Sequence, residues 1–283
     1  MKYLALIVLM FGTMACTADI RPDQLKDKIK PDKHDATRGR ALLQQAAQAH
    51  GVDAFNKVAT YEMTLEDRWV GVMGKMGNPW PEDIVRVKLA YRARSFDGRA
   101  TFLNTDHKGT VWGMQSWKTY EIRPKQTRPT FTDNDDARFI LPAIQYLTEF
   151  IFRDHSKNVV SYAGTKTLHG TKYERVFITW SSLEPSDKHD QYMVYINPKT
   201  KRVEKIFYTV RDFMDMATGA IHFEDMRNVN GVWFPFKQSV TTDVSDKPSE
   251  FMHRITLKQV TLNAPTVDTF EVNAKLRAMG DEK

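Results

Sequence analysis

The segment from Gln191 to Asp243 limits the fold most strongly, because its strand-like stretches follow one another too closely for a crossover helix. Turn residues separate the stretches: residues 197–200 read Asn-Pro-Lys-Thr, and Asn230-Gly231 is the strongest short signal of a β-hairpin. We predict four strands here, at residues 192–196, 203–210, 220–227 and 232–242. Strands joined by such short connections are antiparallel neighbours. The segment therefore predicts a twisted antiparallel sheet rich in aromatic residues.

The rest of the chain adds strands and two main helices to this sheet. Residue alternation predicts further strands at 61–66, 85–94, 100–104, 111–121, 159–167, 173–180 and 251–262. Thr37 is expected to cap a helix that runs to His50, with Gly51 at its C-cap. A central helix is expected to start at Pro142 and to end near Arg153. The sequence thus predicts one mainly β (α+β) domain with a curved sheet.

The central helix is apolar around nearly its whole circumference. Its narrow outer stripe is expected to consist of Gln145, Thr148, Glu149 and Phe152, and its other positions are Ala143, Ile144, Tyr146, Leu147, Phe150 and Ile151. A helix this apolar is either buried by protein or covers an apolar cavity. The aromatic strand residues leave the same two interpretations open, since they fit either a filled core or the wall of a cavity.

The N-terminus has the features of a bacterial lipoprotein signal. Lys2 precedes a short apolar run, and Cys16 follows Ala15 at the expected cleavage site. The alternative is a plain secretory signal with a chance cysteine. We expect a signal peptide at residues 1–15, a flexible tether at 16–36 and one domain at 37–283. With Cys16 as the single cysteine, an intramolecular disulfide is excluded. Thr17 stands where an aspartate resembles an inner-membrane retention signal, which favours the outer membrane.

The sequence offers little support for catalysis or nucleic-acid binding. Charged residues make up 27% of the chain and the net charge is +6, without a dense basic run or a recognition motif. Nucleophile-elbow, phosphate-loop and zinc motifs are absent, and we predict no catalytic residue, metal or cofactor. Two carboxylate groups leave alternatives open: Asp133, Asp135 and Asp136 for calcium, and Asp212, Asp215, Glu224 and Asp225 for acid–base catalysis. Solvated surface positions explain both groups better.

Several motifs together resemble one known superfamily. They are the helix ending in His50-Gly51, the stretch from Tyr195 to Thr200, Phe223-Glu224-Asp225, and the stretch from Asn230 to Pro235. Over residues 37–273 the chain is similar to the superfamily of the periplasmic lipoprotein carrier LolA and the outer-membrane receptor LolB. It looks closer still to uncharacterised relatives that resemble outer-membrane lipoprotein-sorting proteins.

The resemblance implies a half-open antiparallel β-barrel over helices, with a cavity for acyl chains. We expect the cavity to lie between the sheet and the central helix, lined by Trp112, Met114, Ile144, Leu147, Phe150, Ile151, Phe207 and Trp233. The implied function is a monomeric carrier or binding protein for acyl chains, lipidated protein or another apolar ligand. It would be held to the outer membrane by a lipid on Cys16 and would face the periplasm. An envelope hydrolase and an interaction lipoprotein with a filled core are the alternatives.

Overall fold

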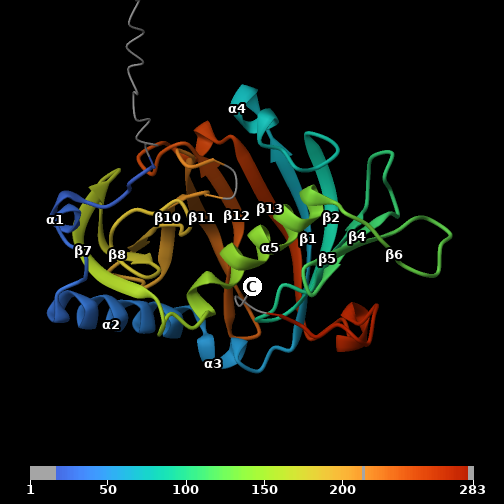
Figure 1. Ribbon diagram of the computed structural model, residues 1–283, viewed down its shortest axis with the longest axis horizontal. Helices are drawn as coiled ribbons and strands as arrows, with labels where there is room; N and C mark the ends of the chain where they lie inside the picture. Colours follow the sequence, from blue (N-terminus) through green and yellow to red (C-terminus); the bar gives the residue numbers. More distant parts are fainter. Residues whose placement is uncertain (1–16, 212–213, 280–283) are drawn as a thin grey trace, which may run out of the picture.

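The computed structural model describes residues 17–211 and 214–279. Within them, thirteen strands form one curved sheet in the order β6-β5-β4-β3-β2-β1-β13-β12-β11-β10-β9-β8-β7 (Figure 1). The strands are β1 (Thr60–Trp69), β2 (Ile84–Arg92), β3 (Gly98–Phe102), β4 (Val111–Gln115), β5 (Lys118–Ile122), β6 (Thr130–Phe131), β7 (Val159–Leu168), β8 (Thr171–Thr179), β9 (Tyr192–Ile196), β10 (Val203–Thr209), β11 (Thr218–Val229), β12 (Val232–Thr241) and β13 (His253–Leu262). The predicted mainly β fold is confirmed.

The sheet consists of two consecutive antiparallel meanders, β1–β6 and β7–β13. Pairing of β1 with β13 joins them, from Tyr61 opposite Leu262 to Trp69 opposite His253. The described strands β6 and β7 lie at the two ends of the order and do not pair with each other, so the sheet stays open. This agrees with the expected half-open arrangement.

The helices are α1 (Asp23–Lys26), α2 (Lys33–His50), α3 (Val52–Phe55), α4 (Gly71–Met76) and α5 (Asp135–Glu149), with 3₁₀ turns at Phe150–Phe152, Pro248–Glu250 and Val267–Phe270. The helices α2, α3 and α5 lie on the concave side of the sheet, and α5 crosses in front of the central strands in Figure 1. Their apolar residues join the main core. In the described part of the chain, every helix is too short or too polar to cross a bilayer.

A second, smaller core lies on the opposite side of the sheet. It includes Leu25 from α1, Phe177 from β8 and Val244 from the β12–β13 connection. Ala18 and Leu25 are buried, and the Ile29 carbonyl accepts a hydrogen bond from Leu183 N at 2.8 Å. Residues 17–36, expected to be a flexible tether, therefore pack against the domain. Apolar residues such as Leu25, spaced among the charges, make this packing favourable.

Turn chemistry placed most strand ends correctly, with one exception. Asn230 and Gly231 have φ angles of 52° and 91°, which confirms the predicted hairpin with both central residues at positive φ. The single strand expected at residues 111–121 is instead a hairpin of β4 and β5. Its turn residues Ser116 and Trp117 also adopt positive φ, at 51° and 62°. Neither residue type is typical of such a turn, so the sequence pattern did not reveal it.

Helix starts also differ from expectation. The helix α2 begins at Lys33, and Thr37 lies inside it with its hydroxyl bonded to the Lys33 carbonyl at 2.9 Å. The C-cap at Gly51 is confirmed, with φ at 92°. The connection between β1 and β2 contains the short helix α4. Pro142 lies in the interior of α5, which starts seven residues earlier, at Asp135.

Candidate functional site

The helix α5 forms one wall of the candidate site. Its N-cap is Asn134, whose side-chain oxygen accepts a hydrogen bond from Ala137 N at 3.0 Å. Asp135 and Asp136 in the first turn suit the positive end of the helix dipole. These polar residues resemble a loop in the sequence, so the sequence pattern predicts a helix start at Pro142 instead. The helix α5 packs on β3, β4 and β5.

The C-terminal end of α5 brings together four of the eight predicted cavity residues. Leu147, Phe150 and Ile151 line one small pocket with Trp233 of β12. Its other lining residues are His50, Thr148, Val203, Ile206, Phe223 and Pro235. The cavity volume is about 20 Å³, enough for roughly one water molecule. The predicted juxtaposition is present, and the side chains nearly fill the space between helix and sheet.

Trp112 and Met114 lie elsewhere on the concave side. They are buried on β4, and Ile144 is buried in the middle of α5. Trp112 stacks on Trp80 with ring centroids 6.1 Å apart and contacts Phe102 edge-on at 5.0 Å. The strands β4 and β12 are five positions apart in the sheet order, or roughly 24 Å along the sheet. These residues therefore share the main core with the pocket of Trp233 and do not line it.

Phe207 lies on the other side of the sheet. It is half-buried and packs against the smaller core that contains Leu25 and Phe177. A register irregularity on β10 between Val203 and Lys205 shifts the alternation in this strand. Ile206 consequently faces the pocket, and its neighbour Phe207 faces away. The expectation that Phe207 faces α5 is wrong because a β-bulge moves side chains to the opposite face.

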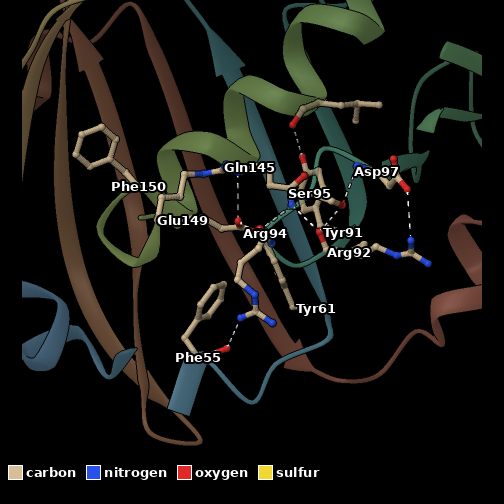
Figure 2. Close-up of polar contacts among 12 residues, drawn as sticks. Phe55, Tyr61, Tyr91, Arg92, Arg94, Ser95, Asp97, Gln145, Glu149 and Phe150 are labelled. Carbon is tan, nitrogen blue, oxygen red and sulfur yellow. Dashed lines mark hydrogen bonds and ion pairs between the residues drawn. The ribbon is translucent and has the colours of Figure 1, made fainter. Parts of the chain in front are cut away.

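A buried polar cluster fixes the C-terminal half of α5 to the sheet (Figure 2). The Glu149 Oε1 atom accepts hydrogen bonds from the Tyr61 hydroxyl at 3.0 Å and from Gln145 Nε2 at 2.8 Å. Its Oε2 atom accepts from the Arg94 backbone N–H at 3.0 Å and from the Arg153 guanidinium at 3.2 Å. Each carboxylate oxygen thus accepts two bonds. Glu149 is completely buried, so these donors replace the water that it loses.

Burial dominates the electrostatics of this cluster. It raises the pKa of the Glu149 carboxyl, while Arg153 and the donors from Gln145, Tyr61 and Arg94 oppose the rise. The pKa of the Tyr61 hydroxyl is raised well above its usual value, again mainly by burial. The Arg153 guanidinium lies over the Phe96 ring at 4.5 Å. The cluster is therefore a desolvated, hydrogen-bonded anchor for the helix.

Further hydrogen bonds connect the Glu149 cluster to the corner between β2 and β3. Gln145 Nε2 also donates to the Arg92 carbonyl at 2.8 Å, and the Tyr91 hydroxyl donates to the Leu141 carbonyl at 3.0 Å. Arg94, at a φ of 60°, donates from its side chain to the carbonyls of Phe55 and Val58. Figure 2 shows this corner directed at the helix. One backbone turn thus holds both α3 and α5.

The expected outer stripe of the central helix is in fact buried. Gln145 and Glu149 are fully covered, and Thr148 and Phe152 are less than a tenth exposed. The apolar residues Tyr146 and Leu147 are instead partly exposed. Periodicity alone places polar residues outward, and it fails when a buried helix has its own polar partners. A usable signal was present, since a helix with no wide polar face must also bury its few polar residues.

A larger cavity of about 780 Å³ lies at the other end of α5. Its lining combines apolar and charged residues: Met76, Gly77, Asn78, Pro79, Ser116, Trp117, Asp135, Asp136, Arg138, Phe139 and Met279. It is bounded by α4, the β4–β5 turn and the first turns of α5. This volume lies within the range of small-molecule sites, roughly 300–1,000 Å³. None of the eight predicted residues lines it, because no sequence pattern connects these three segments.

The carboxylates considered for acid–base catalysis do not form one site among the described residues. Glu224 pairs with Lys237 at 3.1 Å, and Asp225 pairs with Arg227 at 2.6 Å, both within β11 and β12. Asp215 precedes β11 at its opposite end. Asp212 and the predicted lipid-attachment residue Cys16 lie outside the described residues.

The acidic group before α5 also has internal partners. Asp133 and Asp135 both bind the Arg138 guanidinium. Among residues 17–211 and 214–279, no three His, Asp or Glu side chains converge to hold a metal ion.

The curved sheet with α5 across its concave side can be compared with solved structures. One neighbour is a DUF1329 family protein from Desulfovibrio piger, with a TM-score of 0.53 and 11% identity over 84% of this chain and 99% of that one. A LolA superfamily protein from Nitrosomonas europaea matches with a TM-score of 0.51 and 11% identity over 82% and 96%. This chain has a LolA-like fold.

A third structure extends the LolA-like comparison. It is a domain from Vibrio parahaemolyticus named for outer-membrane lipoprotein sorting, with a TM-score of 0.52 and 11% identity over 85% of this chain and 98% of that one. Searches by sequence matched neither a protein-family model nor a curated protein. The fold is thus shared with these structures over 82–85% of this chain, at a sequence identity of 11%.

Proposed function

We propose that this protein is a lipid-anchored carrier or binding protein of the bacterial envelope. It holds acyl chains, a lipidated protein or another apolar ligand between the curved sheet and α5. The observation that carries the proposal is the position of α5. This helix lies over the concave face and directs Leu147, Phe150 and Ile151 toward Trp233. The LolA-like fold and the lipoprotein-sorting name of one structural neighbour support it.

The ligand enters when α5 moves away from the sheet. The present pocket of about 20 Å³ is far smaller than a ligand site of roughly 300–1,000 Å³. An acyl chain that replaces α5 against the sheet gains about 25 cal/mol per Å² of apolar surface it buries. That gain offsets the loss of contacts made by Leu147 and its neighbours. Apolar contact alone supplies the affinity, so the proposal needs no catalytic group.

Probe binding by two substituted proteins tests this function. The delipidated wild type takes up a fatty acid or an apolar fluorescent probe. Leu147→Gln weakens probe binding by about tenfold and changes the melting temperature little, because Leu147 is partly exposed at the pocket. Phe207→Gln is the matched control, since Phe207 lies on the opposite side of the sheet and its loss leaves probe binding unchanged.

Phe150→Gln is the reference against which Leu147→Gln distinguishes an opening pocket from a permanently filled core. Phe150 is buried among Tyr146, His155 and Tyr192, so this change costs about 2–5 kcal/mol of stability under either interpretation. If Leu147→Gln is equally destabilising and the wild type binds no probe, the carrier proposal is wrong. Independently of these variants, mass spectrometry of solvent extracts from natively purified protein identifies a bound ligand or shows that none is present.

One alternative has a specific observation in its favour. The nearly filled pocket below α5 also suits an interaction lipoprotein with a closed core. That protein would take up no apolar ligand, and its extracts would contain none. The uptake measurement therefore separates the two functions.

The proposed location is the periplasmic face of the outer membrane. The support is the signal-like N-terminus, Cys16 at its cleavage site, and Thr17 in place of an aspartate. We further propose that the protein acts as a monomer, held by the lipid on Cys16. Metabolic labelling with a fatty acid and membrane fractionation test this location.

A further inference from the structure

Strongly exposed apolar side chains are concentrated at one end of the sheet. Six large apolar side chains in the described residues are more than half exposed: Ile29 (59%), Val72 (75%), Met73 (64%), Met76 (74%), Met214 (55%) and Met216 (52%). All but Ile29 belong to two short segments, α4 and the β10–β11 link. We call Val72, Met73, Met76, Met214 and Met216 the apolar rim. Isolated exposed apolar residues are ordinary, but a group of this kind marks a contact surface.

The backbone of α4 directs its apolar residues outward. A Cβ atom at Gly74 would lie 2.4 Å from the Met252 carbonyl oxygen, so this glycine lets α4 pack directly on the start of β13. Val70 N donates to the same carbonyl at 2.8 Å. Val72, Met73 and Met76 are spaced one, three and four residues apart, so they share one side of the helix turn. With Gly74 against the protein, that side faces solvent.

The second segment of the rim is bound to the beginning of the described chain. The Asp215 carbonyl, between Met214 and Met216, accepts a hydrogen bond from Ala18 N at 3.0 Å. The Arg211 guanidinium donates to the Ala18 carbonyl at 2.5 Å. Arg211 is buried, so this contact is part of the fold. Residue 18 is therefore held at the rim.

Strand register places both segments at the same end of the sheet. The paired residues across this end are Thr209 with Thr218, Ala220 with Thr241, Val240 with His253, and His253 with Trp69. The link 210–217 follows the first of these residues, and α4 follows the last. Figure 1 shows α4 beyond the upper end of β1. The five residues thus lie at one end of five neighbouring strands, from β10 to β1.

We propose that the apolar rim contacts a phospholipid bilayer surface. The inference that this end of the domain faces the bilayer rests on the proposed lipid anchor at Cys16. Cys16 precedes Ala18 by two residues, and two residues span at most about 7 Å. An acylated Cys16 would therefore keep this end of the domain next to the membrane. Short apolar segments of this kind insert their side chains at the boundary between headgroups and acyl chains.

Vesicle binding without the anchor tests the proposal. A chain that begins at Thr17 keeps every described residue and lacks Cys16. It is expected to co-sediment with vesicles of phosphatidylethanolamine and phosphatidylglycerol. The double variant Val72→Ser, Met73→Ser lowers the partition coefficient at least fivefold, and the double variant Met214→Ser, Met216→Ser lowers it at least twofold.

A control variant removes an exposed apolar side chain at a different place on the surface. The variant Phe131→Ser removes a side chain that is 43% exposed on the edge strand β6, away from the rim. It is expected to partition like the wild type, and circular dichroism verifies that all variants are folded. Absence of vesicle binding by the wild type, or equal binding by the rim variants, overturns the proposal. A wild-type dimer in solution that the rim substitutions dissociate overturns it as well, because the rim then contacts a second copy.

The outcome is independent of the proposed ligand site. The rim variants keep Leu147 and Trp233, so their uptake of an apolar probe from solution remains at the wild-type level. Vesicle binding without probe uptake refutes the carrier proposal alone. Probe uptake without vesicle binding refutes the rim proposal alone.

Discussion

Glu149 is bonded only to donors, two on each carboxylate oxygen. An amide at this position would place its NH₂ group against either Tyr61 and Gln145 or Arg94 and Arg153. Two buried donors would then lose their acceptor, and each such loss costs about 1–3 kcal/mol. The guanidinium of Arg153 would also lose its negative partner, which is costly in a desolvated site.

Glu149→Gln is therefore expected to lower the free energy of unfolding by about 3 kcal/mol or more, measured by urea denaturation. Asp83→Asn is the control, because the Lys75–Asp83 pair is about half exposed and its loss costs less than about 1 kcal/mol. Equal effects of the two substitutions would show that the Glu149 cluster does not hold α5.

His50 makes the stability depend on pH in a defined direction. Its Nε2 atom accepts a hydrogen bond from Val203 N at 3.0 Å, so the ring is neutral in the folded protein. Burial, reinforced by the nearby Arg202 charge, lowers the pKa of His50 to about 4, from 6.5. The unfolded chain therefore binds more protons between these values. Stability from this group is complete above pH 6.5 and is lost as the pH falls toward 4.

His50→Gln is expected to reduce this acid sensitivity, because glutamine can accept the Val203 bond without titrating. Between pH 7.5 and 4.5, the wild type should lose about 2 kcal/mol more stability than the variant, since one pKa unit corresponds to about 1.4 kcal/mol. His34→Gln is the control, since that side chain is 82% exposed. Parallel losses in the wild type and in His50→Gln would contradict the assignment.

The β11–β12 hairpin fixes the register of the strands that line the pocket. Gly231 has a φ of 91°, and a Cβ atom there would lie 3.1 Å from the Ala54 Cβ atom of α3. Gly231→Val is expected to cost more than about 1 kcal/mol, since a β-branched residue is strained at positive φ.

Gly170→Val separates two causes of this loss of stability, the backbone strain at positive φ and the close contact with Ala54. Gly170 has a φ of 78° and open space around it, so this change measures the strain alone. The melting temperature of Gly231→Val should fall further than that of Gly170→Val. An unchanged melting temperature for Gly231→Val would mean that the turn tolerates a β-branched residue.

Local chemistry explains which elements could be predicted from the sequence. Asn230-Gly231 and Gly51 were placed correctly because their backbone angles depend on residue type. The turn at Ser116-Trp117 was not, because neither residue type is typical of positive φ. The start of α5 at Asp135 was not predicted either, although the N-cap Asn134 and the acidic first turn are local signals for it. The sequence also could not reveal the bulge that turns Phe207 away from the pocket.

The candidate site was predicted only in its apolar half. Leu147 and Trp233 meet as expected because a helix and a strand each present a regular face. The partners of Glu149 come from β1, the β2–β3 corner and α5 itself, which are up to 88 residues apart in the chain. No local pattern contains that information, so the buried half of the site follows only from the assembled fold.

At the scale of the whole molecule, the proposed lipid anchor at Cys16 would determine how the domain meets the membrane. Cys16 is expected to carry acyl groups, so mass spectrometry of the N-terminal peptide should show a lipid mass that Cys16→Ser eliminates. Membrane fractionation should show release of the variant, apart from the weaker association contributed by the rim. A wild type that is free in the periplasm without an acyl mass would refute the anchor.

The two edge strands have one further property, because α5 is the segment that connects them. The chain leaves β6 at Phe131, passes through α5, and enters β7 at Val159. Sheet and helix together therefore form a ring, made of hydrogen bonds between strands and of covalent bonds through α5. A helix fixed at both ends cannot swing open like a hinged flap. Outward movement of α5 therefore pulls on both edge strands, β6 and β7. The width of the open sheet and the volume under α5 are thus mechanically coupled.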